Sequence, residues 1–471
     1  MGQEISHSHF TSEESKCFKE LLIEETKLLK KQFEAGEFSS HKPMGGFEIE
    51  AWLVDKSLRP APINNEFFDL FDNPLATPEL AKFNIELNNT PLPLTGNSLK
   101  EFESEIRTVL SEADAVTEKL KSNIILIGTL PTAVADDFCL ENMSSMKRYE
   151  ALNEIVLNAR NNKPLHLDIN GEDHCHLTKH SVMIEAATTS FQIHIQTPWK
   201  QAHHYYNASI IASAPIMAIA GNSPVLFGDK LWHETRIPLF EQAIETGGKQ
   251  RVSFGSGYAE SSILECFEEN LNDYSVFLPM IFNSQPKDFK HLSLHNGVIW
   301  RWNRPLVGFD PDGTPHIRIE HRILPAGPTV SDMMANATFF YGLTQSIMER
   351  ISNQEKMPFE TAKNNFYEAA QYGLQGEINW EGNTYSGDSL QQLIVDKLIP
   401  LAEQGLQQLD LEQASIDHYL NIIKERTISG QTGSVWQIYH LNQHHGDLTK
   451  MTADYLALQH IGQPVHTWAH N

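Results

Sequence analysis

Three short segments carry charged, amide or imidazole side chains at every second position. They are residues 46–52, 190–196 and 317–323. Side chains at positions i and i+2 of a β-strand point to the same face, so each segment predicts a strand with one apolar and one polar face. The polar positions are Glu48 and Glu50 in the first segment, Gln192, His194 and Gln196 in the second, and Arg318, Glu320 and Arg322 in the third.

These polar faces lack the Lys, Thr and Ser that are usual on a solvated strand. Closely spaced carboxylates repel one another unless cations neutralise them. If the three strands share a sheet, their carboxylates and single imidazole would suit Mg²⁺ or Mn²⁺. Arginines beside such metals favour phosphoryl transfer, in which cations offset the charge of the moving phosphate. The alternative is three amphipathic strands whose polar faces meet only solvent.

The composition limits the partners that the protein can have. The chain has 471 residues, with 36 Lys and Arg against 60 Asp and Glu, and its formal net charge is −24. So acidic a surface repels nucleic acid and anionic lipid, and we expect small-molecule substrates instead. The four cysteines are scattered, the first ten residues have no secretory character and no long apolar stretch occurs. We therefore expect a cytoplasmic protein, which is free to form a homo-oligomer.

Helical and strand-like segments must position these side chains. Apolar periodicity predicts helices over 12–35 and 99–122, and short runs bounded by Gly, Pro and Asn predict strands. The expected strands are 46–54, 83–88, 124–128, 182–196, 292–302 and 316–324. After Pro328 the expected helices are 330–352, 359–372, 387–407, 411–425 and 447–461. The predicted fold class is α+β, with a catalytic core over 1–350 and a helical C-terminal section over 351–471.

Seven motifs occur along the chain in an order that is typical of one enzyme family. They are Gly-Phe-Glu-Ile-Glu at 46–50, Phe-Asn-Ile-Glu-Leu-Asn at 83–88, Gly-Thr-Leu-Pro at 128–131, Arg-Tyr at 148–149, Gln-Ile-His at 192–194, Asn-Ser-Pro at 222–224 and Arg-Ile-Glu-His-Arg at 318–322. Over residues 44–345 the chain resembles the glutamate–cysteine ligase and carboxylate–amine ligase family of the glutamine synthetase-like superfamily. Leu130 departs from the His that is usual in the third motif.

The resemblance implies a fold and a set of metal ligands. The fold is a curved antiparallel sheet that forms an active-site funnel, flanked by helices, with ATP as co-substrate at one end and the carboxylate substrate at the other. The implied ligands of Mg²⁺ or Mn²⁺ are Glu48, His194 and Glu320 near the γ-phosphate, and Glu50 and Glu86 for a second ion near the carboxylate substrate.

The same resemblance assigns catalytic roles to two arginines. Arg322, together with Arg318, would stabilise the phosphoryl group during its transfer. Glu185 is a weaker candidate for a further metal ligand, and a solvated carboxylate at the rim is its alternative.

Other side chains are candidates for binding substrate or nucleotide. A guanidinium can grip a carboxylate through two parallel hydrogen bonds, which favours Arg148 and Arg236, although a salt bridge is the alternative for each. Gln192 belongs to the same predicted substrate site. Stacking faces and positive charge occur together just before the third polar strand, where a packed edge strand is the alternative to nucleotide binding. The nucleotide-binding candidates are Trp300, Arg301 and Arg304.

Residues 166–180 are rich in possible metal ligands. His166, Asp168, His174, Cys175 and His176 all fall within this stretch. Its neighbours are residues typical of exposed loops, and no second ligand pair has zinc-site spacing. We therefore expect a solvated or substrate-facing loop rather than a structural zinc site.

Taken together, the resemblance implies an ATP-dependent ligase that forms a C–N bond. The implied reaction joins glutamate to cysteine through a γ-glutamyl phosphate intermediate and gives γ-glutamylcysteine. A guanidino-kinase-like phosphotransferase and a ligase that uses another amine stay open as alternatives, as does a non-catalytic binding module of the same fold. Close carboxylates argue against the binding module, because they destabilise a site that never holds a cation.

Overall fold

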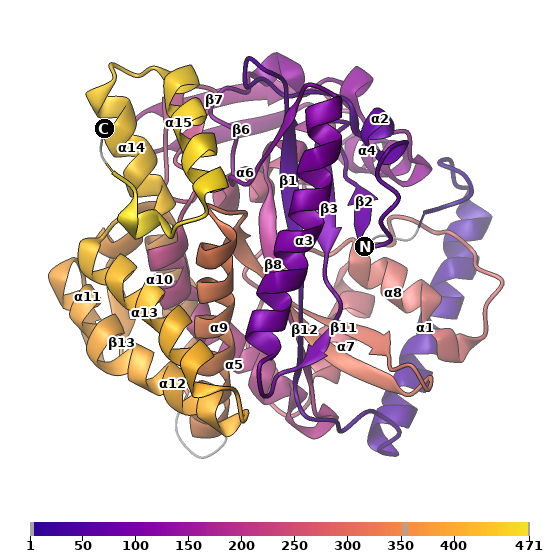
Figure 1. Ribbon diagram of the computed structural model, residues 1–471. Coiled ribbons are helices and arrows are strands. Elements are labelled where there is room, and N and C mark those ends of the chain that lie inside the picture. The colour runs from indigo at the N-terminus through magenta and orange to yellow at the C-terminus, as the bar shows by residue number, and fades with distance from the viewer. Residues whose placement is uncertain (1–3, 352–355, 470–471) are drawn as a thin grey trace.

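The computed structural model describes residues 4–351 and 356–469 (Figure 1). At its centre lies a strongly curled, eight-stranded antiparallel sheet. The strand order is β11-β12-β8-β1-β3-β2, and β4 and β5 also pair with β1. The strands are β1 (Met44–Val54), β2 (Ala76–Pro78), β3 (Asn84–Asn88), β4 (Leu92–Pro93), β5 (Asn123–Ile125), β8 (Ser190–Thr197), β11 (Asn303–Phe309) and β12 (Pro315–Pro325).

The three strands with polar faces are neighbours in this sheet, which is the condition on which the predicted metal site depends. β8 lies between β1 and β12 and pairs with both. In this register Glu320 lies opposite His194, and Glu48 lies opposite Gln192. A β-bulge in β12 after His321 places two residues, Arg322 and Ile323, across from the single residue Gln192.

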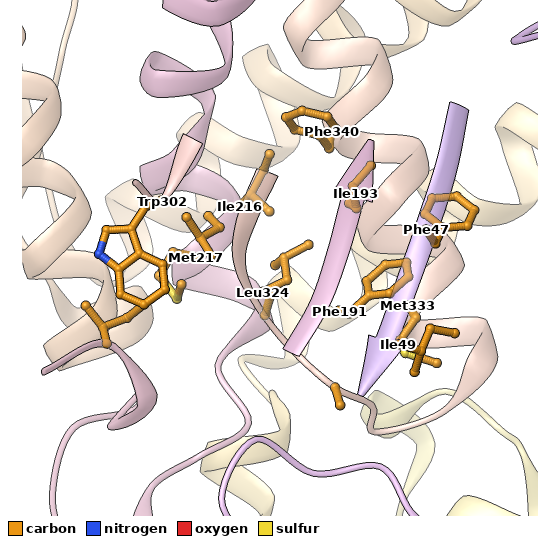
Figure 2. Packing of buried hydrophobic residues seen from close by; sticks show 14 of the residues in the cluster. Phe47, Ile49, Phe191, Ile193, Ile216, Met217, Trp302, Leu324, Met333 and Phe340 are labelled. Carbon is orange, nitrogen blue, oxygen red and sulfur yellow. The ribbon is translucent and has the colours of Figure 1, made fainter. Parts of the chain in front are cut away.

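The opposite face of the sheet forms the hydrophobic core. Figure 2 shows Phe47 and Ile49 of β1 beside Phe191 and Ile193 of β8. The helices α5 (Ala202–Ala220) and α9 (Val330–Ile351) pack against this face. Burying each large apolar side chain contributes roughly 1.5–3 kcal/mol, so the apolar face holds the sheet in place while the polar face is left for chemistry.

Two contacts show how the helices hold the strands. The hydroxyl of Tyr341 on α9 donates to the carbonyl oxygen of His194, at 3.1 Å. The rings of Phe47 and Phe191 lie 5.2 Å apart across the β1–β8 pair. The backbone of the predicted metal ligand His194 is therefore fixed by the core that lies behind it.

Helices surround the sheet, and Figure 1 shows the C-terminal ones gathered on one side. The remaining helices and strands are α1 (Ser12–Glu34), α2 (Asn64–Phe68), α3 (Ser98–Lys119), α4 (Lys147–Ala159), β6 (Leu165–Asn170), β7 (His174–Lys179), β9 (Val225–Leu226), β10 (Asp229–Lys230), α6 (Arg236–Ala243), α7 (Leu264–Asp273), α8 (Lys290–Gly297), α10 (Phe359–Tyr372), β13 (Ile378–Trp380), β14 (Asn383–Tyr385), α11 (Asp388–Leu393), α12 (Ile399–Gln408), α13 (Gln413–Ser429), α14 (Gly433–Gln443) and α15 (Leu448–Ile461).

Three of the expected elements are wrong. Residues 292–302 were expected to form a strand, but 290–297 form helix α8 and the strand β11 begins only at Asn303. The strand expected over 182–196 begins at Ser190, because 182–187 form a short 3-10 helix. The stretch 166–180 is not a loop: β6 and β7 pair as an antiparallel hairpin.

Two of the C-terminal helices, α12 and α13, contact α9 through polar side chains. Ser346 Oγ donates to the carbonyl oxygen of Leu401, and Arg426 forms a buried ion pair with Asp332 at 2.7 Å. The expected division between residues 350 and 351 stays a prediction, and residues 352–355, beside it, lie outside the described residues, as does the last residue of the helix expected over 330–352. Among the described residues, no helix is both long and apolar enough to cross a bilayer.

Candidate active site

A cavity of about 300 Å³ opens beside the polar face of the sheet. Strands β1, β3, β8, β11 and β12 contribute to its lining, as do helices α4 and α8. The lining combines acidic, basic and apolar side chains. The glutamates are Glu50, Glu79, Glu86 and Glu185; the arginines are Arg148, Arg304, Arg318 and Arg322; and the apolar side chains include Leu278, Leu292, Leu294, Val298, Trp300 and Leu306.

Glu48, His194 and Glu320 form a buried cluster next to this cavity. Their potential ligand atoms all lie within 4.8 Å of one another. His194 Nε2 lies 3.1 Å from Glu48 Oε1 and 3.9 Å from Glu320 Oε1. Neither His194 Nε2 nor Glu48 Oε2 has a hydrogen-bond partner among the described residues. Two buried polar atoms without partners in a cluster of two carboxylates and an imidazole fit a divalent cation.

The other ring nitrogen of His194 is bonded to an arginine of the cavity. Arg318 Nε donates to His194 Nδ1 at 3.3 Å. With Nδ1 acting as acceptor, a neutral imidazole carries its proton on Nε2, the atom that faces Glu48. If Nε2 held a cation, a neutral ring would carry its proton on Nδ1, which could then not accept from Arg318.

Glu320 already has its countercharge in the protein. Arg304 Nε and Arg322 Nη1 donate to Glu320 Oε2 at 2.8 and 3.0 Å. Burial alone would raise the pKa of Glu320, but these two guanidinium groups outweigh that effect and hold the pKa well below its usual range. Arg322 also donates to Gln192 Oε1, while its Nε has no partner among the described residues.

Three of the four glutamates that line the cavity have the opposite electrostatic problem, the exception being Glu86, whose pKa is lowered. Burial, opposed in part by Arg322, raises the pKa of Glu50. Burial, followed by the charges of Glu86 and Glu50, raises the pKa of Glu79 well above its usual value. Burial and the charge of Glu50 raise the pKa of Glu185 to about 8. These carboxylates lack sufficient positive charge around them, which is the environment that a second cation would balance.

Hydrogen bonds orient the carboxylates of Glu50 and Glu86. Glu50 lies opposite Glu86 in the β1–β3 pair. Glu50 accepts from the backbone N–H of Ser190 at 2.7 Å and from Gln192 Nε2 at 2.8 Å. Glu86 accepts from Asn88 Nδ2 at 2.8 Å. The strand backbones and their amide side chains thus hold Glu50 and Glu86 toward the same space.

Most of the predicted site residues meet at or beside this cavity, and their functional roles stay predictions. Glu48, Glu50, Glu86, His194, Glu320, Arg318 and Arg322 all lie on the polar face or line the cavity, together with Gln192, Arg148, Arg304 and Trp300. Arg148 Nη2 donates to the hydroxyl of Tyr149 at 2.6 Å, at the α4 side of the cavity.

Two predicted residues lie elsewhere. Arg301 does not line the cavity; it is buried and pairs with Glu269 at 2.9 Å. Arg236 is also buried outside the lining, where it pairs with Glu234 at 2.9 Å and donates to the carbonyl oxygen of Ile323. Both guanidinium groups are occupied by structural partners, so neither is placed to hold nucleotide or substrate.

Glu79 is the main site residue that sequence reasoning missed. It directly follows the short edge strand β2 and belongs to none of the alternating patterns. Its only sequence signal is that it lies a few residues before the acidic segment 83–88. The curl of the sheet brings it to the cavity beside Glu86.

Two solved structures have a similar fold. The glutamate–cysteine ligase of Francisella tularensis, solved in complex with AMP, is 13% identical with a TM-score of 0.59; the match covers 92% of this chain and 91% of that one. A bifunctional glutathione synthetase from Pasteurella multocida is 10% identical with a TM-score of 0.54, covering 93% of this chain and 55% of that one. Among curated proteins, no sequence match is found.

The curled antiparallel sheet with its flanking helices has the glutamine synthetase-like fold. The chain belongs to glutamate–cysteine ligase family 2, whose family model matches residues 44–454. It is therefore an ATP-dependent enzyme that forms an amide bond between a carboxylate and an amine. The family match extends beyond residue 345, where the resemblance read from the sequence ends, and so includes most of the C-terminal helices.

We predict opposite effects of Glu79→Gln on stability and on activity. In excess EDTA the variant should gain roughly 1 kcal/mol in free energy of unfolding, because one of several mutually repelling carboxylates is removed. Its ligase activity with Mg²⁺ should fall at least about tenfold, as for residues that support a metal site. Denaturant unfolding and steady-state assays test this. Glu20→Gln, on the exposed face of α1, is the control and should change neither quantity. A destabilised Glu79→Gln protein would contradict the proposed crowding of charge.

Proposed function

We propose that the enzyme joins the side-chain carboxylate of glutamate to the amine of cysteine. In this reaction ATP phosphorylates the γ-carboxylate, and the amine then displaces phosphate to give γ-glutamylcysteine. One observation carries the proposal: a single cavity combines four glutamates, four arginines and an apolar wall beside the Glu48–His194–Glu320 cluster. Each part matches one chemical feature of the substrates.

The carboxylates are the groups that would hold the metal ions. Glu48, His194 and Glu320 would hold one Mg²⁺ or Mn²⁺, and Glu50 and Glu86, supported by Glu79 or Glu185, would hold a second. When bound, these ions supply positive charge to the phosphate oxygens and to the substrate carboxylate.

Arg322 and Arg318 would act on the phosphoryl group. Both line the cavity; Arg322 is anchored to the proposed metal cluster through Glu320, and Arg318 lies next to His194. Arg322 Nε is a buried donor without a partner among the described residues. A preorganised donor of this kind stabilises charge that spreads over the phosphoryl oxygens during transfer.

The ends of the cavity suit an amino acid and a nucleotide. Arg148 lies near Glu79 and Glu86 and offers a guanidinium for the α-carboxylate of glutamate, while the carboxylates around it suit an α-ammonium group. Leu292, Val298 and Trp300 offer an apolar surface for adenine.

A substrate panel tests the proposed reaction. Purified enzyme with Mg²⁺ and ATP is assayed for ADP release with glutamate alone, with glutamate plus each of several amino acids, and with creatine or arginine. We expect the fastest ADP release with glutamate plus cysteine, and a product whose mass equals that of γ-glutamylcysteine. Faster turnover with a different amine would show that this amine, and not cysteine, is the acceptor substrate. ADP release with creatine or arginine, and none with glutamate, would contradict the ligase reaction.

Replacing Arg322 tests the role of the arginine. Arg322→Ala should lower kcat roughly 100-fold or more, because removing one preorganised donor costs about 3 kcal/mol in the transition state. The KM for ATP should change much less, since binding also uses the metals and the apolar wall. The protein should still fold, because Arg304 continues to neutralise Glu320.

The control for this variant is Arg107→Ala, which removes a half-exposed guanidinium outside the cavity lining that bonds Glu103 and Ser331. It should leave both kinetic constants unchanged. A normal kcat in Arg322→Ala, accompanied by a lowered melting temperature, would show that Arg322 is a structural residue.

A further inference from the structure

The hairpin β6–β7 carries three potential metal ligands on its exposed face, away from the cavity. Asp168 lies directly across from His176, and His174 lies two residues before His176 on the same strand face. One ligand atom from each of Asp168, His174 and His176 lies within 4.8 Å of the other two. Asp168 Oδ1 and His174 Nε2 are already 2.8 Å apart. Three ligands therefore converge on one point at the surface.

The backbone under these ligands is anchored to the body of the protein. Gln242 of α6 accepts from the N–H of Asp168 at 2.7 Å and donates to its carbonyl oxygen at 3.2 Å. Trp232 Nε1 donates to the carbonyl oxygen of Asn170 at 2.9 Å. On the opposite face of the hairpin the side chains of Leu165, Leu167, Ile169 and Cys175 are buried. The ligands thus project from a fixed ribbon, so little ordering is needed for binding.

We propose that Asp168, His174 and His176 form a second metal site, which binds a transition-metal ion of the Zn²⁺, Ni²⁺ or Cu²⁺ class. Two imidazoles select these ions over Mg²⁺, which prefers oxygen ligands. Zinc–nitrogen bonds of about 2.0–2.1 Å hold tetrahedral ligand atoms roughly 3.3 Å apart, a spacing that small side-chain rotations reach here. Because His174 and Asp168 remain 53% and 58% exposed, the remaining coordination positions face water.

This site is separate from the ATP-binding cavity. None of its three ligands lines the cavity. The proposal of a metal site on β6–β7 therefore does not depend on which substrates the ligase uses. It also replaces the expectation of a solvated loop over 166–180, because strand pairing, and not loop flexibility, positions the imidazoles.

Zinc titration in excess Mg²⁺ tests the proposal. Metal-free enzyme is titrated with Zn²⁺ in competition with a chromophoric chelator, and the wild type is compared with a double variant, His174→Ala with His176→Ala. We expect the double variant to bind one ion fewer per chain, and Asp168→Asn to bind that ion at least about tenfold more weakly. His166→Ala, on the same hairpin face but outside the cluster, is the matched control and should retain the ion. Mg²⁺-dependent ligation should be unchanged in all of them.

A measurement on the wild type covers the case in which a variant does not fold. Imidazole acylation, mapped by peptide mass, should label His174 and His176 without Zn²⁺ and should spare them when Zn²⁺ is present, while His166 is labelled in both. Equal zinc stoichiometry in the wild type and the double variant would overturn the proposal. So would loss of the same ion in His166→Ala, or unchanged labelling of His174 and His176 with Zn²⁺.

Discussion

Buried carboxylates need nearby positive charge, and this requirement organises the polar face of the sheet. Glu320 receives that charge from Arg304 and Arg322, and its pKa is held low despite burial. Glu50 and Glu79 receive too little of it, and burial raises the pKa of each. The protein therefore neutralises one part of its polar face internally, and under the proposed function ions that arrive with the substrate would neutralise the other part. In the proposed reaction the same ions would also balance the charge of the phosphate.

The fold enforces this arrangement through the period of the β-strand. Because side chains alternate between the faces, the apolar packing of Phe47, Ile49, Phe191 and Ile193 against α9 determines which residues face the cavity. A shift of one residue in the pairing of β8 would bury His194 in the core and expose the core residues to the cavity. The energy of the core thus fixes the positions of carboxylates that repel one another in the absence of ions.

Alternating patterns predicted the strands of the site, and they failed where position depends on distant packing. Strand period placed Glu48, His194 and Glu320 on polar strand faces, and the family resemblance grouped them as one set of metal ligands. Arg301 and Arg304 were both predicted to bind nucleotide. Arg304 lies within β11 and pairs with Glu320, whereas Arg301 precedes the strand and pairs with Glu269. Helix α5 was not predicted because it is apolar on every side and shows no amphipathic period. The position of Glu79 depends on the curl of the main sheet. The cluster of Asp168, His174 and His176 depends on the pairing of β6 with β7. Local sequence patterns predict neither.

The most direct test of the account follows an oxygen atom through the reaction. Glutamate with ¹⁸O in its side-chain carboxylate is ligated with ATP and cysteine, and the mass of the released phosphate is measured. If the polar face of the sheet promotes phosphorylation of the carboxylate, the amine breaks the bond between the acyl carbon and the labelled oxygen, and the released phosphate carries one ¹⁸O atom. Amide product accompanied by unlabelled phosphate would contradict the account.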